Sequence, residues 1–184
     1  MDRRSFAVGL LSLSILFSCV KPSPKSIPIT PQQQQDALLL YKAGVQKLQT
    51  KQFNPALEDF IRVVSQYPSS SSADNAYLRI GQIYALQNRK RSAAESYQKL
   101  IRDYPDSDVY DPALRDLGHL YFEAHRLDDG LRYYSQIQLD KLRMEDQRKI
   151  VERSTQALQQ TKDDSLAIKW LIALDQSRYP SKPS

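Results

Sequence analysis

Few side chains in this sequence have the types and spacing that catalysis or metal binding requires. His119 and His125 are six residues apart, about 240° around a helix, so they cannot hold one metal ion from a single face. Asp106, Asp108 and Asp111 look like the start of a calcium loop, but the glycine and the distal glutamate of that motif are missing. The sequence also has no glycine-rich phosphate loop, no G-x-S-x-G and no H-E-x-x-H. We therefore expect no enzyme, no metal ion, no cofactor and no small-molecule substrate.

A different chemistry is indicated at Cys19, the only cysteine of the chain, which can form no intramolecular disulfide. Arg3 and Arg4 lie before an apolar segment at residues 6–17, and the small residue Ser18 directly precedes the cysteine. A positive start, a short apolar run and a small residue are the parts of a signal peptide. The run is too short to span a bilayer, which takes ~20 residues. We predict a signal peptide at residues 1–18.

The four residues from Leu16 to Cys19 resemble the bacterial lipobox, in which an aliphatic residue stands three places before a lipidated cysteine. The resemblance implies that Cys19 becomes an acylated N-terminus, with palmitate-type chains that hold the protein at a membrane. Val20 stands where inner-membrane lipoproteins of enteric type have aspartate, which implies the outer membrane and a folded part that faces the periplasm. Two arginines also look like a twin-arginine signal, so the export route stays open. The alternative is an ordinary signal peptide with a chance cysteine.

Residues 19–35 contain no aromatic residue and no helical apolar period. Prolines at positions 22, 24, 28 and 31 and a run of four glutamines dominate the segment. We expect a Pro/Gln-rich tether after the lipidated cysteine. In polyproline II form, at ~3.1 Å per residue, the fifteen residues 21–35 would hold the folded part up to ~45 Å from the membrane. The folded domain is expected to begin at Asp36.

Composition and charge favour one helical domain. The chain has 184 residues with 41% apolar side chains, enough for a core without metals or disulfides, and its 5 glycines are too few for a turn-rich all-β fold. The formal charge of +5 is spread along the sequence and does not favour nucleic acid as a partner. The densest positive stretch, residues 89–91, is interpreted as a solvated turn, with a basic patch for lipid headgroups or nucleic acid as the alternative.

A step of 37 residues organises the sequence from residue 36 onward. Gly44, Gly81 and Gly118 are separated by this step. A glycine inside a helix costs ~1 kcal/mol relative to alanine, so a recurring one indicates two helices that approach too closely for a side chain. The same step links a small residue and, one helical turn later, an aromatic residue on the same face. These positions are Ala56, Ala93 and Gly130, then Phe60, Tyr97 and Tyr134.

Each unit therefore reads as two helices joined by a turn. We expect helices near 36–50 and 55–66, then from a cap at Ser72 or Asp74 to about Gln87 and over 92–103, then over 112–124 and 128–139. Units at about 37–70, 74–106 and 111–143 precede a degenerate fourth at about 148–178, in which Thr155 replaces the glycine, and a disordered tail at 179–184. Gly130 should tolerate alanine, because its equivalents are alanines. The predicted fold is an all-α superhelix of three helix pairs plus a degenerate fourth pair.

The order and spacing of Gly81, Tyr84, Ala93, Tyr97 and Pro105 resemble the tetratricopeptide repeat, which implies a superhelix that binds other proteins. The period of 37 rather than 34 is similar to that of two kinds of periplasmic protein. One is the BamD-like outer-membrane lipoproteins, and the other is the repeat domain of the Tol-Pal cell-division coordinator. The resemblance to BamD implies outer-membrane assembly, although that family has about five repeats.

The first helix of each pair should line the concave side of a curved stack. Positions three before, one after and four after each glycine then line a protein-binding groove. Their largely apolar character predicts a ligand segment with apolar side chains and an acidic group for Arg115. The alternative is that these residues pack on neighbouring helices or on the tether. The positions are Tyr41, Val45, Leu48, Leu78, Gln82, Ala85, Arg115, His119 and Phe122.

Taken together, these patterns predict a non-enzymatic lipoprotein scaffold on the periplasmic face of the outer membrane. It would bind other cell-envelope proteins through its groove, in outer-membrane assembly, and would be held at the membrane by its lipid anchor. Two alternatives remain open at this stage. One is a role in Tol-Pal or cell-division coordination, and the other is a structural subunit of an envelope machine that has no peptide groove.

Overall fold

The computed structural model describes residues 28–160 and the single residues 165, 168 and 172. In this part of the chain seven α-helices and one short 3-10 helix follow one another, and no strand is formed, which confirms the predicted all-α class. The elements are α1 (Pro31–Gln49), α2 (Phe53–Gln66), α3 (Ala73–Leu86), α4 (Lys90–Asp103), α5 (Tyr110–Glu123), α6 (Leu127–Tyr134), the 3-10 helix η2 (Leu139–Lys141) and α7 (Met144–Leu158).

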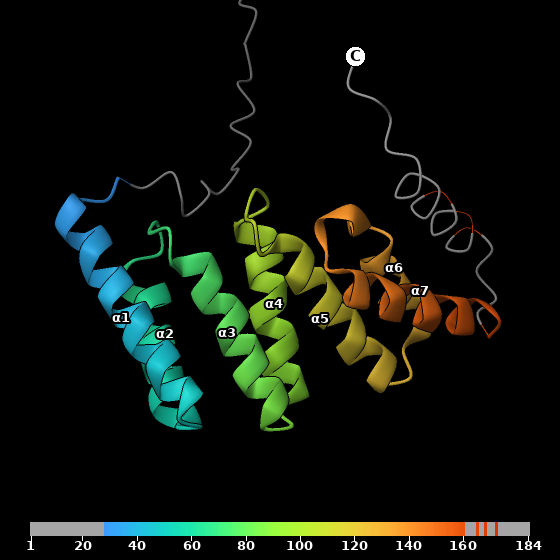
Figure 1. Cartoon of the computed structure of the whole chain (residues 1–184), viewed down its shortest axis with the longest axis horizontal. Helices are drawn as coiled ribbons and strands as arrows, with labels where there is room; N and C mark the ends of the chain where they lie inside the picture. The colour runs from blue at the N-terminus through green and yellow to red at the C-terminus, as the bar shows by residue number, and fades with distance from the viewer. Residues whose placement is uncertain (1–27, 161–164, 166–167, 169–171, 173–184) are drawn as a thin grey trace, which may run out of the picture.

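The helices form pairs that stack side by side along the molecule (Figure 1). Within a pair, α1 packs on α2, α3 on α4 and α5 on α6, while contacts of α2 with α3 and of α4 with α5 join one pair to the next. α7 contacts α6 and lies across the end of the array. The larger contacts all join elements close in sequence, which is the arrangement of a solenoid.

A glycine of the first helix lies against an aromatic ring of the second helix in every pair. A β-carbon added at Gly44 would lie 2.9 Å from Cε1 of Phe60, and one added at Gly81 would lie 2.7 Å from Cδ1 of Tyr97. Gly118 faces the ring of its own partner aromatic in the same way. The rings are fully or almost fully buried. The predicted close approach is therefore confirmed, but a ring, and not a second backbone, occupies the space.

Gly130 belongs to a different contact, and the expectation that it tolerates alanine is wrong. A β-carbon at Gly130 would lie 2.8 Å from Cε2 of Phe122, on the first helix of the same pair. The equivalent positions in the second pair hold Ala93 and Ala85. In the third pair the large side chain of Phe122 on the first helix thus faces Gly130 on the second, and the missing side chain of the glycine leaves room for the ring.

The turn inside each pair has one repeated geometry. Lys51, Asn88 and His125 are 37 residues apart and have φ angles of 59°, 57° and 57°. In the second pair the N–H of Asn88 donates to the carbonyl three residues earlier at 2.9 Å, and the N–H of Arg89 donates to the carbonyl of Tyr84 at 2.8 Å. This pair of bonds is a Schellman motif, which most often has glycine at the left-handed position. It ends the first helix and sets the direction of the second.

A buried tyrosine side chain links the loop after the first pair to the end of the second pair. The Tyr104 side chain is buried at 1% exposure, and its hydroxyl donates to the carbonyl oxygen of Pro68 at 2.7 Å. Both residues belong to the recurring Tyr-Pro step, so the end of one pair is fastened to the end of the pair before it. Pro55 and Pro112 lie in the first turns of α2 and α5, where the missing N–H of proline breaks no helical hydrogen bond.

α1 begins at Pro31, five residues before the predicted start. Thr30 forms a capping box: its hydroxyl accepts from the N–H of Gln33 at 3.2 Å, and the Gln33 side chain accepts from the N–H of Thr30 at 2.9 Å. The side chain of Gln34 accepts a hydrogen bond from the N–H of Ser71, in the loop between α2 and α3, at 3.2 Å. Glutamines assigned to the tether therefore belong to the folded part. The signal peptide, Cys19 and the tether up to residue 27 lie outside the described residues.

The step of 37 residues fails after Tyr134. α6 ends at this residue instead of continuing to Leu139. Ile137, Leu139 and Leu142 are 5%, 3% and 9% exposed, and they pack in one cluster with Ile150 of α7. A helix would have turned some of these side chains to solvent, so burial of apolar surface favours the irregular path.

The fourth unit also departs from the predicted register. α7 starts at Met144, before the expected boundary at 148, and the fully buried small residue is Ser154, whereas Thr155 is exposed. Val151 and Leu158 are half-buried and pack against the apolar cluster that contains Ile150. The predicted partner helix and the tail at 179–184 lie outside the described residues, apart from exposed positions 165, 168 and 172.

The glycine–ring contact can be tested at Gly81. Gly81→Ala should lower stability by about 1–2 kcal/mol, because the clash with the 2% exposed Tyr97 exceeds the ~1 kcal/mol helix preference of alanine. The melting temperature, followed by circular dichroism, should fall by about 2–8 °C. In a Tyr97→Leu background the same Gly81→Ala change should instead be stabilising. A higher melting temperature for the single variant would contradict this packing.

Candidate functional site

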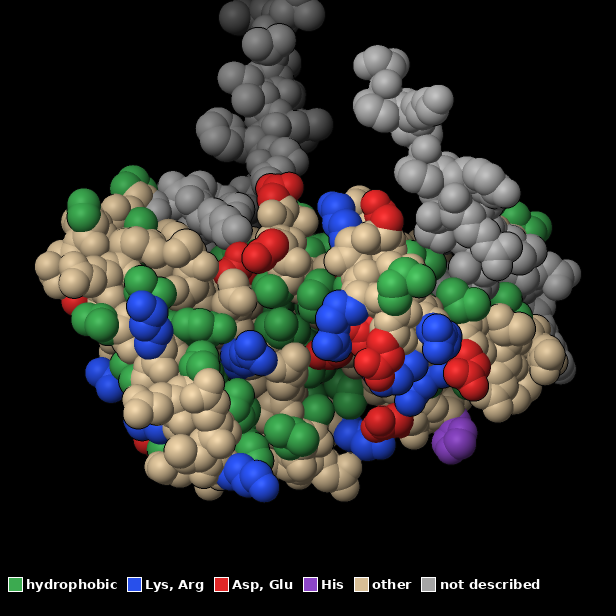
Figure 2. Space-filling view, viewed as in Figure 1, with side chains coloured by type: hydrophobic (Ala, Val, Ile, Leu, Met, Phe, Trp, Pro, Cys, Tyr) green, Lys and Arg blue, Asp and Glu red, His purple; other side chains and the backbone are tan. Residues whose placement is uncertain are grey.

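The first helices α1, α3 and α5 present the predicted groove residues, and Figure 2 shows this side of the molecule. Apolar side chains lie between the helices, and charged side chains gather over α5 and α7. Tyr41, Val45 and Leu48 are half-buried against the main core, and the ring centroid of Tyr41 is 5.5 Å from that of Phe60. Leu78 is a core residue at 6% exposure. For these four the alternative interpretation, packing on neighbouring helices, describes the contacts.

Arg115 is used inside the protein. Its guanidinium donates to Asp116 at 2.8 Å and to Asp146 of α7 at 2.9 Å, and its side chain is 16% exposed. Burial alone would lower the pKa of Arg115, but the two carboxylates raise it above its usual value. The Gln82 amide donates to Asp116 at 3.1 Å and accepts from Arg79 at 3.0 Å, so one polar chain links α3, α5 and α7. The expected acidic ligand group for Arg115 is therefore disfavoured.

His119 is also more buried than its predicted place on the surface of the groove would require. Its Nδ1 is in hydrogen-bonding contact with the Tyr134 hydroxyl, and the two rings meet edge to face with centroids 5.6 Å apart. The pKa of His119 is lowered to about 4, first by burial and then by the positive charges of Arg153 and Arg115, which outweigh the opposite effect of Asp146. The imidazole is therefore neutral at neutral pH and forms part of the packing between α5 and α6.

A cleft of about 450 Å³ opens between α3 and α5. We call it the concave cleft. Three of its lining residues belong to the predicted set, namely Gln82, Ala85 and His119. Sequence reasoning missed the other five, although Leu86 directly follows a predicted position and is 68% exposed. They are Leu86, Tyr97, Asp116, Leu120 and Glu123.

The concave cleft combines an apolar floor with an acidic rim. Tyr97 and Leu120 are 2% and 9% exposed and form the floor. Burial, followed by the nearby Asp116, raises the pKa of Tyr97, so its phenol stays protonated. Asp116 and Glu123 contribute the charges, and none of the lining residues that the structure describes is a lysine or an arginine. This geometry can receive an apolar side chain whose neighbour is positively charged or donates hydrogen bonds.

Phe122, the last predicted groove residue, lies away from the concave cleft. Its ring centroid is 5.0 Å from that of Tyr134, and its edge covers Gly130. It lines a smaller hollow of about 350 Å³ shared with Arg153 and Ala157 of α7. The predicted positions therefore do not form one continuous site.

Among the described residues, no three histidine, cysteine, aspartate or glutamate side chains form a group that could hold a metal ion. No helix in the described ranges has the length and apolar character needed to cross a bilayer.

The tetratricopeptide repeat family matches the chain at residues 38–70 and 75–107. Two solved structures of the protein MamA have the same arrangement of helices. They are 19% and 18% identical to this chain, each with a TM-score of 0.51, covering 80% of this chain and 81% and 78% of their own. The tetratricopeptide-repeat domain of Sgt2 from Aspergillus fumigatus is 14% identical with a TM-score of 0.45, covering 84% of this chain and 87% of its own. No curated protein sequence matches the chain.

These findings confirm the predicted fold class, because the repeat match falls on the first two helix pairs and the MamA structures extend the same fold over most of the chain. At these identities the structures support the fold alone. The resemblance to BamD-like lipoproteins and to the Tol-Pal coordinator stays a prediction.

The neutral state of His119 gives a testable pH dependence. The pKa of His119 is about 4 in the folded state and about 6.5 in the unfolded state. Between about pH 6.5 and pH 4 the unfolded state therefore binds a proton that the folded state does not, and the free energy of unfolding falls as the pH is lowered. We expect the melting temperature to fall over this range. The His119→Gln variant should show a smaller fall than wild type, measured side by side. Equal slopes in the two proteins would show that His119 is not held neutral.

Proposed function

We propose that this tetratricopeptide-repeat protein is a non-enzymatic scaffold that binds a segment of another protein in the concave cleft. The observation that carries the proposal is the exposure of Leu86, 68%, beside a floor made by Tyr97 and Leu120. An apolar side chain that enters the cleft would bury this leucine, and burial of a leucine contributes roughly 1.5–3 kcal/mol.

The charges of the cleft define the partner further. Asp116 and Glu123 line it, and Glu123 is half exposed. One Asp116 oxygen faces two guanidinium nitrogens of Arg115, whereas the other accepts a hydrogen bond from Gln82 and can accept a second. The preferred ligand is therefore a segment with an apolar side chain next to a lysine or an arginine. This replaces the acidic ligand group that the sequence suggested.

A structural subunit without a peptide groove is the second candidate function, and one observation favours it. The predicted groove positions of α1, together with Leu78 of α3, pack against the core and offer little free apolar surface; those of α1 are Tyr41, Val45 and Leu48. A partner of such a subunit would contact a broad face, and no single cleft residue would decide its binding. The two candidates therefore differ in their response to a change at one position.

The proposed location is the periplasmic face of the outer membrane, with Cys19 acylated. The positive n-region, the apolar run before Cys19, the lipobox-like residues and Val20 support this proposal. The cleft would then serve other cell-envelope proteins, and outer-membrane assembly is the proposed setting. Tol-Pal or cell-division coordination is the alternative setting that the same long-loop repeats support.

Binding through the concave cleft is tested with Leu86→Ser. When tagged protein is purified from envelope membranes, the amount of partner protein that co-purifies with this variant should be about tenfold lower than with the wild type, because an anchor contact is lost. Ile61→Ser is the matched control, because Ile61 is 41% exposed on α2, outside the cleft. Equal retention by both variants would support the structural subunit instead. Leu78 cannot be used for this purpose, because serine at this buried position would disturb the core.

Lipidation is tested separately. Metabolic labelling with a fatty-acid analogue should mark the wild-type protein and not Cys19→Ser, and the variant should partition into the aqueous phase after detergent extraction. The chemical reason is that the cysteine thiol is the only such group in the chain. A wild-type protein that stays unlabelled and aqueous would remove the proposed anchor, but not the proposed cleft.

A further inference from the structure

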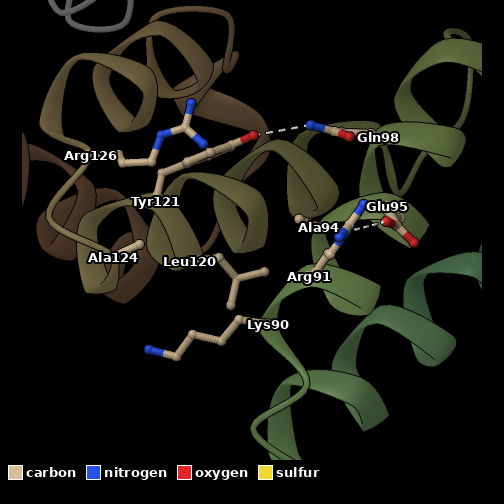
Figure 3. Close-up of a pocket in the computed structure, with 9 residues that line it drawn as sticks. All are labelled: Lys90, Arg91, Ala94, Glu95, Gln98, Leu120, Tyr121, Ala124 and Arg126. Atoms are coloured by element: carbon tan, nitrogen blue, oxygen red, sulfur yellow. Dashed lines mark hydrogen bonds and ion pairs between the residues drawn. The ribbon is translucent and has the colours of Figure 1, made fainter.

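A second cleft lies on the other side of α5, between the start of α4 and the turn that joins α5 to α6 (Figure 3). We call it the outer cleft. Its volume is about 340 Å³. Figure 3 shows Leu120 and Ala94 at its centre, with positive side chains around them from three directions. These side chains are Lys90, Arg91 and Arg126.

One wall of the outer cleft is held rigidly. The Arg126 guanidinium lies 4.7 Å from the ring centroid of Tyr121, and Tyr121 in turn stacks on Tyr133 at 5.3 Å with an angle of 8° between the rings. The Gln98 amide donates to the Tyr121 hydroxyl at 3.1 Å. His125, in its left-handed conformation, fixes the backbone just before Arg126. Little side-chain freedom is then lost when a ligand meets this arginine, which favours binding.

The electric field in the outer cleft favours an anion. Glu95 is the only carboxylate among the described lining residues, against three cations. Each cation has an ion-pair partner: Arg91 pairs with the exposed Glu95 at 3.1 Å, and Lys90 with the exposed Glu123 at 3.2 Å. Arg126 pairs with Asp129, whose side chain is 25% exposed. The two exposed pairs each contribute only about 0–1 kcal/mol, so a ligand carboxylate can replace Glu95 or Glu123 at small cost.

The start of α4 adds to this field. Lys90 is the first residue of the helix, no side chain caps this end by hydrogen bonding, and the first turn contains no acidic residue. The partial positive charge of a helix N-terminus is therefore not neutralised within the helix, and it adds to the charges of Lys90 and Arg91.

We infer that the outer cleft binds an acidic segment of a partner protein, with an apolar side chain over Leu120 and Ala94 and a neighbouring carboxylate among Lys90, Arg91 and Arg126. The site shares Leu120 with the concave cleft but does not rest on the function proposed for that cleft. From sequence alone, residues 89–91 read as a solvated turn. The structure adds Arg126, which occupies the position of Arg89 in the next pair, to the same surface.

The experiment uses purified protein and a fluorescein-labelled peptide of alternating leucine and glutamate, with binding followed by fluorescence anisotropy. A leucine–lysine peptide of equal length is the reference. We expect the acidic peptide to bind and the basic one not to bind at this site. Arg91→Gln and Arg126→Gln should each weaken binding about three- to tenfold. Arg91 is 95% exposed, so this variant should fold even if Arg126→Gln does not.

Two control variants separate this site from other charges. Arg102→Gln removes an exposed arginine that also pairs with a carboxylate, Asp103, but lies outside the cleft, and it should leave affinity unchanged. Leu86→Ser should also have no effect, because Leu86 lines only the concave cleft. No binding of the acidic peptide, a loss of leucine–lysine peptide binding with Arg91→Gln as large as that of the acidic peptide, or an equal loss with Arg102→Gln and Arg91→Gln would overturn the inference. So would binding to phosphatidylglycerol vesicles or inorganic phosphate without binding to the acidic peptide.

Discussion

In each helix pair an aromatic ring of the second helix lies where a glycine of the first helix has no side chain, and the other features of the structure depend on this contact. It lets Phe60, Tyr97 and Tyr134 fill the space between helices while the helices stay close. Because the ring takes the inner side of the first helix, the residues on its outer side become the exposed face. Tyr97 shows the link directly, since the same side chain that covers Gly81 also forms the floor of the concave cleft.

Charge, rather than apolar area, separates the two clefts on either side of α5. Both use Leu120 as part of their floor. The concave cleft has Asp116 and Glu123 at its rim, whereas the outer cleft has three cations and one carboxylate. The ion pair between Lys90 and Glu123, 3.2 Å long, joins the rim of one cleft to the rim of the other. Ligands of opposite charge on the two sides would each compete for one member of this pair.

Periodicity predicted what depends on residues within one unit, and it failed where contacts cross units. The spacing of Gly81 and Tyr97 was sufficient to predict a helix pair, because both residues serve the same contact. One of the two carboxylate partners of Arg115 is Asp146 of α7, where the 37-residue step no longer holds. The early start of α1 was missed for another reason. Its capping box uses Gln33, a residue within a run that looks like low-complexity sequence.

Contacts limited to neighbouring elements also have a mechanical consequence. α1 packs mainly on α2, and its buried residues are Ala37 and Gly44. The side chain of Gln34 also bonds to Ser71, in the loop that follows α2. A pulling force applied through the N-terminal segment would therefore load α1 before any other helix. Such a helix can peel away and redock while α3 to α6 keep their packing, because in the described part of the chain the contacts of α1 are mainly with α2 and the loop that follows it. The first helix would then act as an extensible element in series with the rest of the array.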